Sequence, residues 1–118
     1  MQHLEYQLQC QIIQWARISI AKYPCLKWLN SSQNGVKLTS AMAGARAKKG
    51  GMVKDYPDLF FPHITKKYYG LFIELKIKPN KPTTEQKEWI KYLNEAGYLA
   101  VVCYNFDEAR DTIINYLS

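Results

Sequence analysis

An acid and a base stand two positions apart in an otherwise apolar stretch, residues 70–76 (GLFIELK). Because side chains alternate between the faces of a strand, Glu74 and Lys76 are expected to point one way while Ile73 and Leu75 point the other. Burying either charge without a partner would be unfavourable. The pattern therefore predicts that Glu74 and Lys76 meet further polar groups on one face of a sheet.

A second carboxylate, Asp58, lies within the preceding stretch, residues 56–61 (YPDLFF), directly before its three apolar residues 59–61. Pro57 restricts the approach of the chain, so Asp58 is expected within reach of Glu74. Two carboxylates, a main-chain carbonyl and waters form an oxygen-only site that suits Mg²⁺, with Mn²⁺ able to substitute. Such an ion activates water and neutralises charge on a phosphate. With Lys76 orienting or helping to deprotonate the attacking water, these parts predict hydrolysis of a phosphodiester.

An alternative stays open for the same residues. Glu74 and Lys76 could form a cross-strand pair on the surface of a one-sided sheet, with Asp58 as a turn residue. An isolated Glu-x-Lys would favour that alternative, whereas its place inside an apolar strand that follows Pro57 and Asp58 favours the hydrolase.

The surrounding segments predict the elements that must position these residues. Leu4, Leu8, Ile12 and Ala16 follow the spacing of one helical face, which ends near Pro24. Strands are predicted at residues 26–29, 58–61, 69–77 and 98–104, helices at 83–97 and 106–117, and a helix or a mobile basic loop at 37–49. The strand at 98–104 is apolar throughout, which is typical of the middle of a sheet. The order predicts one α/β domain over residues 1–118, with a mixed central sheet flanked by helices.

Composition limits the classes of function. The chain has 118 residues, 47% of them apolar, and a formal net charge of +6, which excludes disorder and low-complexity structure. No apolar run reaches the ~20 residues of a membrane span, and the first residues are too polar for a secretory signal. Three cysteines without a Cys-x-x-Cys pair indicate a reduced, cytoplasmic protein. We expect neither a membrane partner nor a small-molecule cofactor.

Charge is unevenly spread along the chain. Residues 1–54 carry eight Lys or Arg and one acid, whereas residues 55–118 carry eight Lys or Arg and nine acids. Such asymmetry predicts a surface that meets a polyanion; a basic composition without a specific partner is the alternative. The three tryptophans are expected in the core or at an interface rather than stacked on bases. The candidate contacts to a DNA backbone are Lys37, Arg46, Lys48, Lys49 and Lys54.

These motifs resemble the VRR-NUC domain, the virus-type replication–repair nuclease module of the PD-(D/E)XK superfamily. The resemblance covers most of the chain and rests on Glu5, Pro57-Asp58, Glu74-Leu75-Lys76, Gln86 and the closing strand and helix. It implies a restriction-endonuclease-like core in which Asp58, Glu74 and the main-chain carbonyl of Leu75 bind the metal and Lys76 is the catalytic lysine.

The same resemblance implies a biological setting. Small members of this kind are typically encoded by viruses or prophages, which places them in the host cytoplasm. They resemble dimeric Holliday-junction resolvases, which implies a homodimer acting on four-way or otherwise branched DNA.

Glu5 and Gln86 gain site roles from the resemblance. Glu5 lies within the apolar face of the first helix, so it either holds a metal-bound water or belongs to a frayed first turn. Gln86 follows Thr83 at the spacing of a capping box, yet it also lies one turn before the core-facing Trp89, where its amide could hold a water or a phosphate. Asp55 is a departure, because the family commonly has glycine two residues before the Pro-Asp pair. The loop conformation before Asp58 is therefore left open.

Three hypotheses follow. The first is a Mg²⁺-dependent DNA endonuclease that cuts branched DNA as a homodimer. The second is a catalytically silent DNA-binding module of the same fold, which predicts loss of a metal-binding or lysine residue; Asp58, Glu74 and Lys76 are all present, which counts against it. The third is a nuclease subunit that nicks or cuts flap or duplex DNA within a larger replication–repair assembly.

Overall fold

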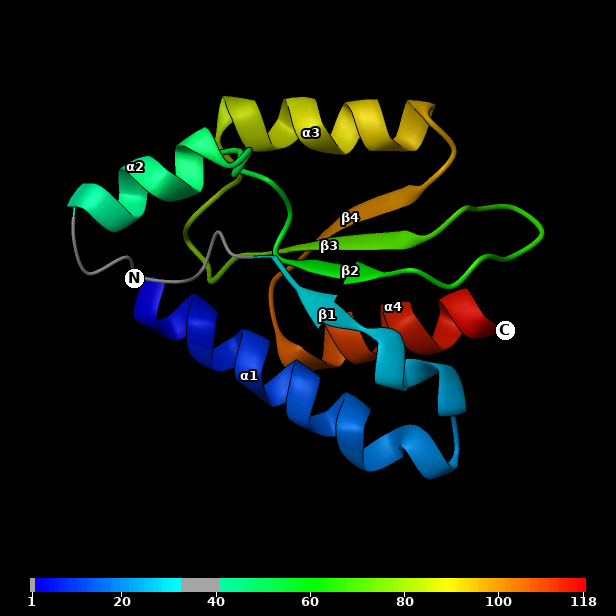
Figure 1. Ribbon diagram of the computed structural model, residues 1–118. Helices are drawn as coiled ribbons and strands as arrows, with labels where there is room; N and C mark the ends of the chain where they lie inside the picture. The colour runs from blue at the N-terminus through cyan, green and yellow to red at the C-terminus, as the bar shows by residue number, and fades with distance from the viewer. Residues whose placement is uncertain (1, 33–40) are drawn as a thin grey trace.

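The computed structural model describes residues 2–32 and 41–118 (Figure 1). Lys37 therefore lies outside the described residues. The elements in chain order are α1 (Gln2–Ile18), the short 3₁₀ helices η1 (Ser19–Ala21) and η2 (Pro24–Trp28), β1 (Asn30–Ser31), α2 (Ala41–Lys49), β2 (Leu59–Phe61), β3 (Leu71–Leu75), α3 (Thr84–Glu95), β4 (Leu99–Cys103) and α4 (Phe106–Leu117).

The described strands form one four-stranded sheet in the order β1-β2-β3-β4. β2 pairs antiparallel with β1 and with β3, whereas β3 and β4 run parallel because α3 carries the chain back between them. Helices α1 and α4 cover one face of the sheet and α3 covers the other (Figure 1). The predicted α/β fold, with a mixed sheet between helices, is confirmed.

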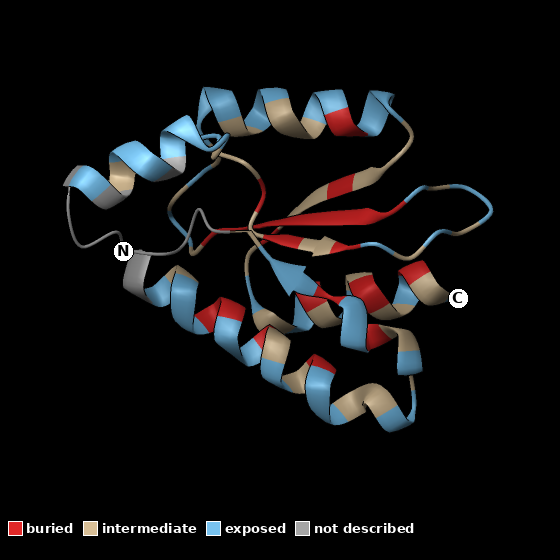
Figure 2. Ribbon diagram, viewed as in Figure 1, coloured by how far each residue is buried: buried red, intermediate tan, exposed pale blue. Residues whose placement is uncertain are grey.

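The core has two apolar layers, one on each face of the sheet (Figure 2). On the face of α1 and α4, Ile12, Ile73 and Ile113 are fully buried, and on the face of α3, Phe72 packs with Leu93. Strand β3 is buried along its whole length. Since its side chains alternate between faces, Glu74 shares the α3 face with Phe72. The fold therefore places a carboxyl group beside an apolar layer.

Two predicted strands differ from the structure. Residues 26–29 were expected to form a strand, but Pro24 begins η2 instead, and its buried Leu26 anchors this turn to the core. Residues 98–104 were expected in the middle of the sheet, but β4 is its edge strand. Its side chains are apolar because α3 and α4 both pack against it. An apolar strand therefore indicates that both of its faces are covered by helices, and it does not indicate that a strand lies on each side of it.

The segment that the sequence left open between helix and loop contains helix α2, whose described basic side chains are all exposed. No helix in the described part of the chain combines the length and apolar character needed to cross a membrane.

Candidate active site

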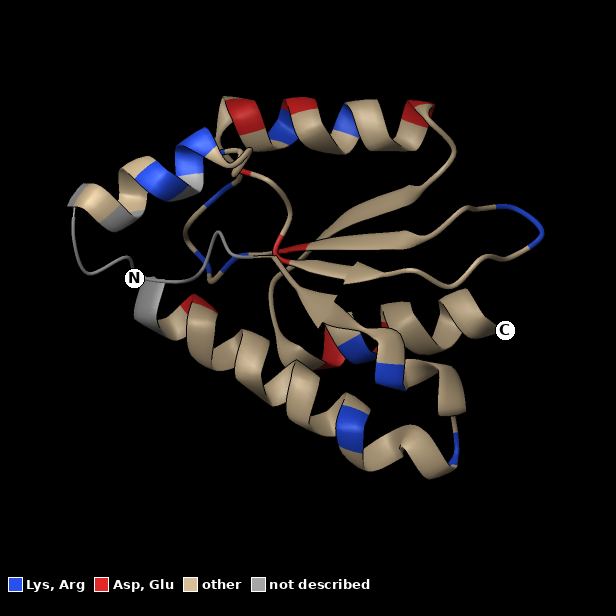
Figure 3. Cartoon of the chain, in the orientation of Figure 1, with Lys and Arg blue, Asp and Glu red and all other residues tan. Residues whose placement is uncertain are grey.

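The two antiparallel strands β2 and β3 bring the predicted acids to one end of the sheet. Asp58 directly precedes β2, and Glu74 follows Ile73, which stands opposite Leu59. Figure 3 shows acidic positions where these strand ends meet. Residues far apart in the sequence thus become neighbours through strand register.

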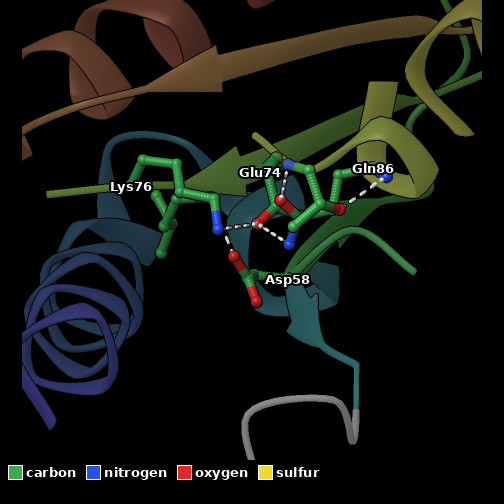
Figure 4. A network of polar contacts seen from close by, with 6 residues as sticks. Asp58, Glu74, Lys76 and Gln86 are labelled. Carbon is green, nitrogen blue, oxygen red and sulfur yellow. Dashed lines mark hydrogen bonds and ion pairs between the residues drawn. The ribbon is translucent and has the colours of Figure 1, made fainter. Parts of the chain in front are cut away.

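Glu74 is almost completely buried, with 2% of its surface exposed. Its Oε2 accepts a hydrogen bond from Nε2 of Gln86 at 3.1 Å and lies 3.9 Å from Nζ of Lys76 (Figure 4). Its Oε1 is buried and has no hydrogen-bond partner among the described residues. Such an oxygen is unfavourable unless a proton or a cation satisfies it.

When no cation is bound, a proton on the Glu74 carboxyl group satisfies this oxygen. Burial, and then the negative charge of Asp58, raise the pKa of Glu74 to about 9, although the charge of Lys76 opposes the shift. Glu74 therefore holds a proton at neutral pH in the metal-free protein. A divalent cation can replace that proton.

Asp58 is half-buried and is oriented by the main chain of β3. Its Oδ2 accepts a hydrogen bond from the amide of Leu75 at 2.8 Å, which continues the contact between β2 and β3 beyond their last paired residues. Burial raises the pKa of Asp58, while this amide hydrogen bond works in the opposite direction. The carboxylate is therefore fixed in place beside Glu74 (Figure 4).

Lys76 is buried as well, with 8% of its surface exposed. Its main-chain amide donates to the carbonyl of Cys103 on β4 at 3.0 Å, which fixes the backbone just beyond β3. Its side chain points toward Glu74 and Asp58 (Figure 4). A buried ammonium group next to two carboxyl groups is placed to orient a water or to stabilise negative charge.

Gln86 completes the predicted capping box and also contacts the candidate site, while its role in holding a water or a phosphate stays a prediction. Its side-chain oxygen accepts a hydrogen bond from the amide of Thr83 at 2.9 Å, and the hydroxyl of Thr83 accepts one from the amide of Gln86, which completes a capping box. Its side-chain nitrogen donates to Glu74. One side chain thus starts helix α3 and holds the buried carboxyl group in position.

Glu5 on α1 is half-buried and acts on the site through space, since its charge raises the pKa of both Asp58 and Glu74. Within residues 2–32 and 41–118, however, no three His, Cys, Asp or Glu side chains are arranged to hold a metal ion together. Glu5 is therefore not a direct third ligand beside Asp58 and Glu74 in this arrangement. Its role in holding a metal-bound water stays a prediction.

The donor set fits a small hard cation. Asp58 and Glu74 supply carboxylate oxygens, one of them buried without a partner, and the main-chain carbonyl of Leu75 follows directly in sequence. Mg²⁺ is usually held by one or two carboxylates and keeps several waters or substrate phosphate oxygens. A site with only two carboxylates therefore suits Mg²⁺ better than an ion that needs a full cage of protein ligands.

The predicted DNA-contacting residues are separate from this buried cluster. Arg46, Lys48 and Lys49 lie exposed on α2, and Lys54 lies exposed in the segment that leads from α2 to Asp58. No ion pair of the described residues involves any of these four cations. They form an uncompensated basic surface on the chain that enters the site (Figure 3).

Two features before Asp58 become clear only from the structure. Asp55 has a φ of +68°, which is the left-handed conformation that glycine adopts most easily. The residue type thus differs from the glycine common in the family, but the backbone has a conformation that suits glycine. Tyr56, two residues before Asp58, packs edge-on against Phe72 and Trp89. The sequence signal for Tyr56, its place directly before Pro57, was missed.

Comparisons with known proteins agree with this geometry. The sequence pattern of the VRR-NUC domain matches residues 1–107, and the chain belongs to that family. A solved structure described as a VRR_NUC domain protein superimposes with a TM-score of 0.78 at 28% sequence identity, covering 96% of this chain and 87% of the other. No curated protein matches the chain. The fold and family together define a nuclease domain, and a nuclease must bind the nucleic acid that it hydrolyses.

Proposed function

We propose that this protein is a Mg²⁺-dependent endodeoxyribonuclease. The observation that carries the proposal is the buried, unpartnered Oε1 of Glu74 at a point where Asp58, Lys76 and Gln86 converge. Asp58, Glu74 and the carbonyl of Leu75 would hold the ion, and Mn²⁺ is expected to substitute for it. When bound, the ion would lower the pKa of a water and neutralise charge on the scissile phosphate.

The chain's own residues then have distinct tasks. Lys76 would orient the attacking water and stabilise the negative charge that develops on the phosphate. Gln86 would keep the Glu74 carboxyl group in one orientation, and the Leu75 amide does the same for Asp58. Glu5 would assist from α1 by holding a water rather than the ion.

The substrate proposed is branched DNA, including four-way junctions, cut by a homodimer. Exposed cations on α2 can follow a phosphate backbone without reading bases, which suits recognition by shape. A symmetric junction needs incisions on two strands, and a dimer provides two equivalent sites.

The first prediction is selective cleavage of branched DNA. Wild type with Mg²⁺ or Mn²⁺ is expected to cut a synthetic four-way junction faster than linear duplex. Asp58→Asn and Lys76→Ala should each lower the rate roughly a hundredfold or more, because one removes a metal ligand and the other removes the group beside the attacking water. Cleavage is measured on strand-labelled DNA in a denaturing gel, with chelator as the control.

The outcomes separate the parts of this proposal. No cleavage by wild type, or equal cleavage by the variants, would contradict the nuclease site. Cleavage of flaps but not junctions would favour a role as a flap-cutting subunit. Light scattering during the reaction tests the dimer, and a monomer that makes paired incisions would rule it out.

A further inference from the structure

A second cluster of basic and aromatic residues lies where α1, η1 and η2 meet, outside the candidate active site. It consists of Arg17 at the end of α1, Lys22 and Tyr23 between the two 3₁₀ helices, and Lys27 and Trp28 at the end of η2. We call these five residues the basic aromatic patch. Of the two places expected for Trp28, the core is excluded, because 60% of its surface is exposed, whereas a place at an interface stays a prediction.

The patch is held to the protein core by defined contacts. Nη1 of Arg17 donates hydrogen bonds to the carbonyls of Leu26 at 2.9 Å and Lys27 at 3.2 Å. Leu26 itself is completely buried. The η2 turn is therefore fixed against α1, and Trp28 projects from an anchored segment rather than from a free loop.

Each lysine of the patch lies over an aromatic ring. Nζ of Lys27 is 4.7 Å from the centre of the Trp28 ring, and Nζ of Lys22 is 5.5 Å from that of Tyr23, distances at which a cation is attracted to the ring face. No ion pair of the described residues involves Arg17, Lys22 or Lys27. The patch thus presents uncompensated positive charge together with an exposed indole.

The patch is connected to the active site by a short stretch of chain. Ser32 follows Trp28 by only a few positions, and its amide donates to the carbonyl of Asp58 at 2.8 Å. An extended chain of that length spans about 13 Å, which is roughly the rise of four nucleotides along a DNA strand. The backbone of Trp28 therefore lies within about that distance of the main chain at Asp58, along the path that β1 follows from η2 (Figure 1).

We propose that the basic aromatic patch binds the DNA strand next to the cleavage site, with Lys22 and Lys27 on phosphates and Trp28 stacked on an unpaired base. The faces of bases are available only where the duplex stack is interrupted, as at a flap or a branch point. The patch would thereby give the protein a preference for DNA with unpaired bases. This inference rests on the proposed function only in taking DNA as the substrate.

The test measures DNA binding without cleavage. All variants are made in the Asp58→Asn background and studied in chelator, by fluorescence anisotropy, with a blunt duplex and the same duplex carrying a short single-stranded flap. K22E/K27E is compared with K66E/K67E, an adjacent exposed pair in the loop between β2 and β3, at the other end of these strands from the active site. Both pairs change the net charge equally, so the comparison removes the general effect of charge.

The lysine pair of the patch is expected to matter more than the control pair. K22E/K27E should weaken binding to both DNAs roughly tenfold more than K66E/K67E, because only the patch lysines would lie on phosphates. An equal weakening by both pairs would show that net charge alone is responsible and would overturn the phosphate contacts of the patch.

Trp28 is expected to act on unpaired bases only. Trp28→Ala should weaken binding to the flap DNA roughly fivefold or more and leave the blunt duplex unchanged, and Trp28→Phe should keep most of the affinity. Ile18→Ala, at a neighbouring exposed apolar residue of α1, is the control for loss of apolar surface. An equal effect of Trp28→Ala on both DNAs, or none on either, would overturn the stacking role.

These results are independent of catalysis. Thermal melting in chelator verifies that each variant is folded. If wild type cuts no DNA while the patch variants bind as weakly as expected, the patch stands and the nuclease proposal fails. If wild type cuts branched DNA while the patch variants bind like their controls, the patch fails and the nuclease proposal stands.

Discussion

At the residue scale, the carboxyl group of Glu74 combines a candidate catalytic role with an unfavourable position in the fold. It is buried with one oxygen unpartnered, and its pKa is raised to about 9, chiefly by burial and then by the charge of Asp58. The folded metal-free protein therefore keeps a proton that the unfolded chain loses above its ordinary pKa of 4.5. Ionising this group in the folded state opposes folding.

The second prediction concerns the pH dependence of stability without metal. The protonated Glu74 contributes its full share to the free energy of unfolding below the unfolded pKa of 4.5. As pH rises from there toward 9, the free energy of unfolding falls by up to about 1.4 kcal/mol per pH unit. Glu74→Gln should remove this loss, so that the variant is more stable than wild type at pH 8 and shows a flatter profile. Urea unfolding in chelator between pH 5 and pH 9 measures it.

A matched control is available on helix α3. Glu95→Gln makes the same chemical change at an exposed position and should leave the pH profile of wild type unchanged. Parallel profiles for wild type and Glu74→Gln would contradict the buried, protonated state of Glu74.

At the element scale, the first turn of α3 links helix stability to the site. Thr83 caps the helix, and the side chain of Gln86 closes the capping box with its oxygen while its nitrogen binds Glu74. The geometry of the cap therefore contributes to the orientation of a candidate metal ligand. Helix α4 offers a comparison, because Asn105 caps it by accepting a hydrogen bond from the amide of Glu108.

The third prediction uses these two caps. Thr83→Ala and Asn105→Ala should each lower the free energy of unfolding by about 1 kcal/mol, measured by urea denaturation. Only Thr83→Ala should also slow DNA cleavage, because only its helix end holds Gln86 against Glu74; Thr83→Ser should restore both properties. If the two alanine variants cut DNA equally well, the first turn of α3 would have no role in the site beyond stability.

At the scale of the whole molecule, the distribution of charge separates a buried acidic site from exposed basic surfaces. The net charge of +6 arises largely from residues 1–54, and the structure places part of that charge on α2 and part in the basic aromatic patch. Both surfaces can bind phosphates while the buried acids at the ends of β2 and β3 remain apart from them.

The fourth prediction concerns the salt dependence of DNA binding by α2. Replacing Lys48 and Lys49 with glutamine should reduce the slope of log K against log salt by about 0.9 for each phosphate that the protein no longer neutralises. The pair Lys66 and Lys67, also adjacent and exposed, is the control and should leave the slope nearly unchanged. DNA titrations at several salt concentrations, with all variants made in the Asp58→Asn background, measure this slope. An equal change of slope for the two lysine pairs would contradict a specific role for α2.

The sequence by itself determined the fold class and the family, and it named candidate site residues whose roles stay predictions. Alternation within β3 placed Glu74 and Lys76 on the face opposite Ile73 and Leu75, because side-chain direction in a strand is a local property. The cap at Thr83 was equally local. Roles that depend on spacing over a few residues could therefore be predicted.

Only the tertiary structure decided which of these groups meet and in what environment. The edge position of β4, the exposure of Trp28, the contact of Gln86 with Glu74 and the unpartnered oxygen of Glu74 all depend on elements distant in sequence. Burial and strand register are properties of the packed chain, and they set the pKa of Glu74 and bring Asp58 to its side. The candidate site residues could be named from the sequence, whereas their protonation and charge depend on how the chain packs around them.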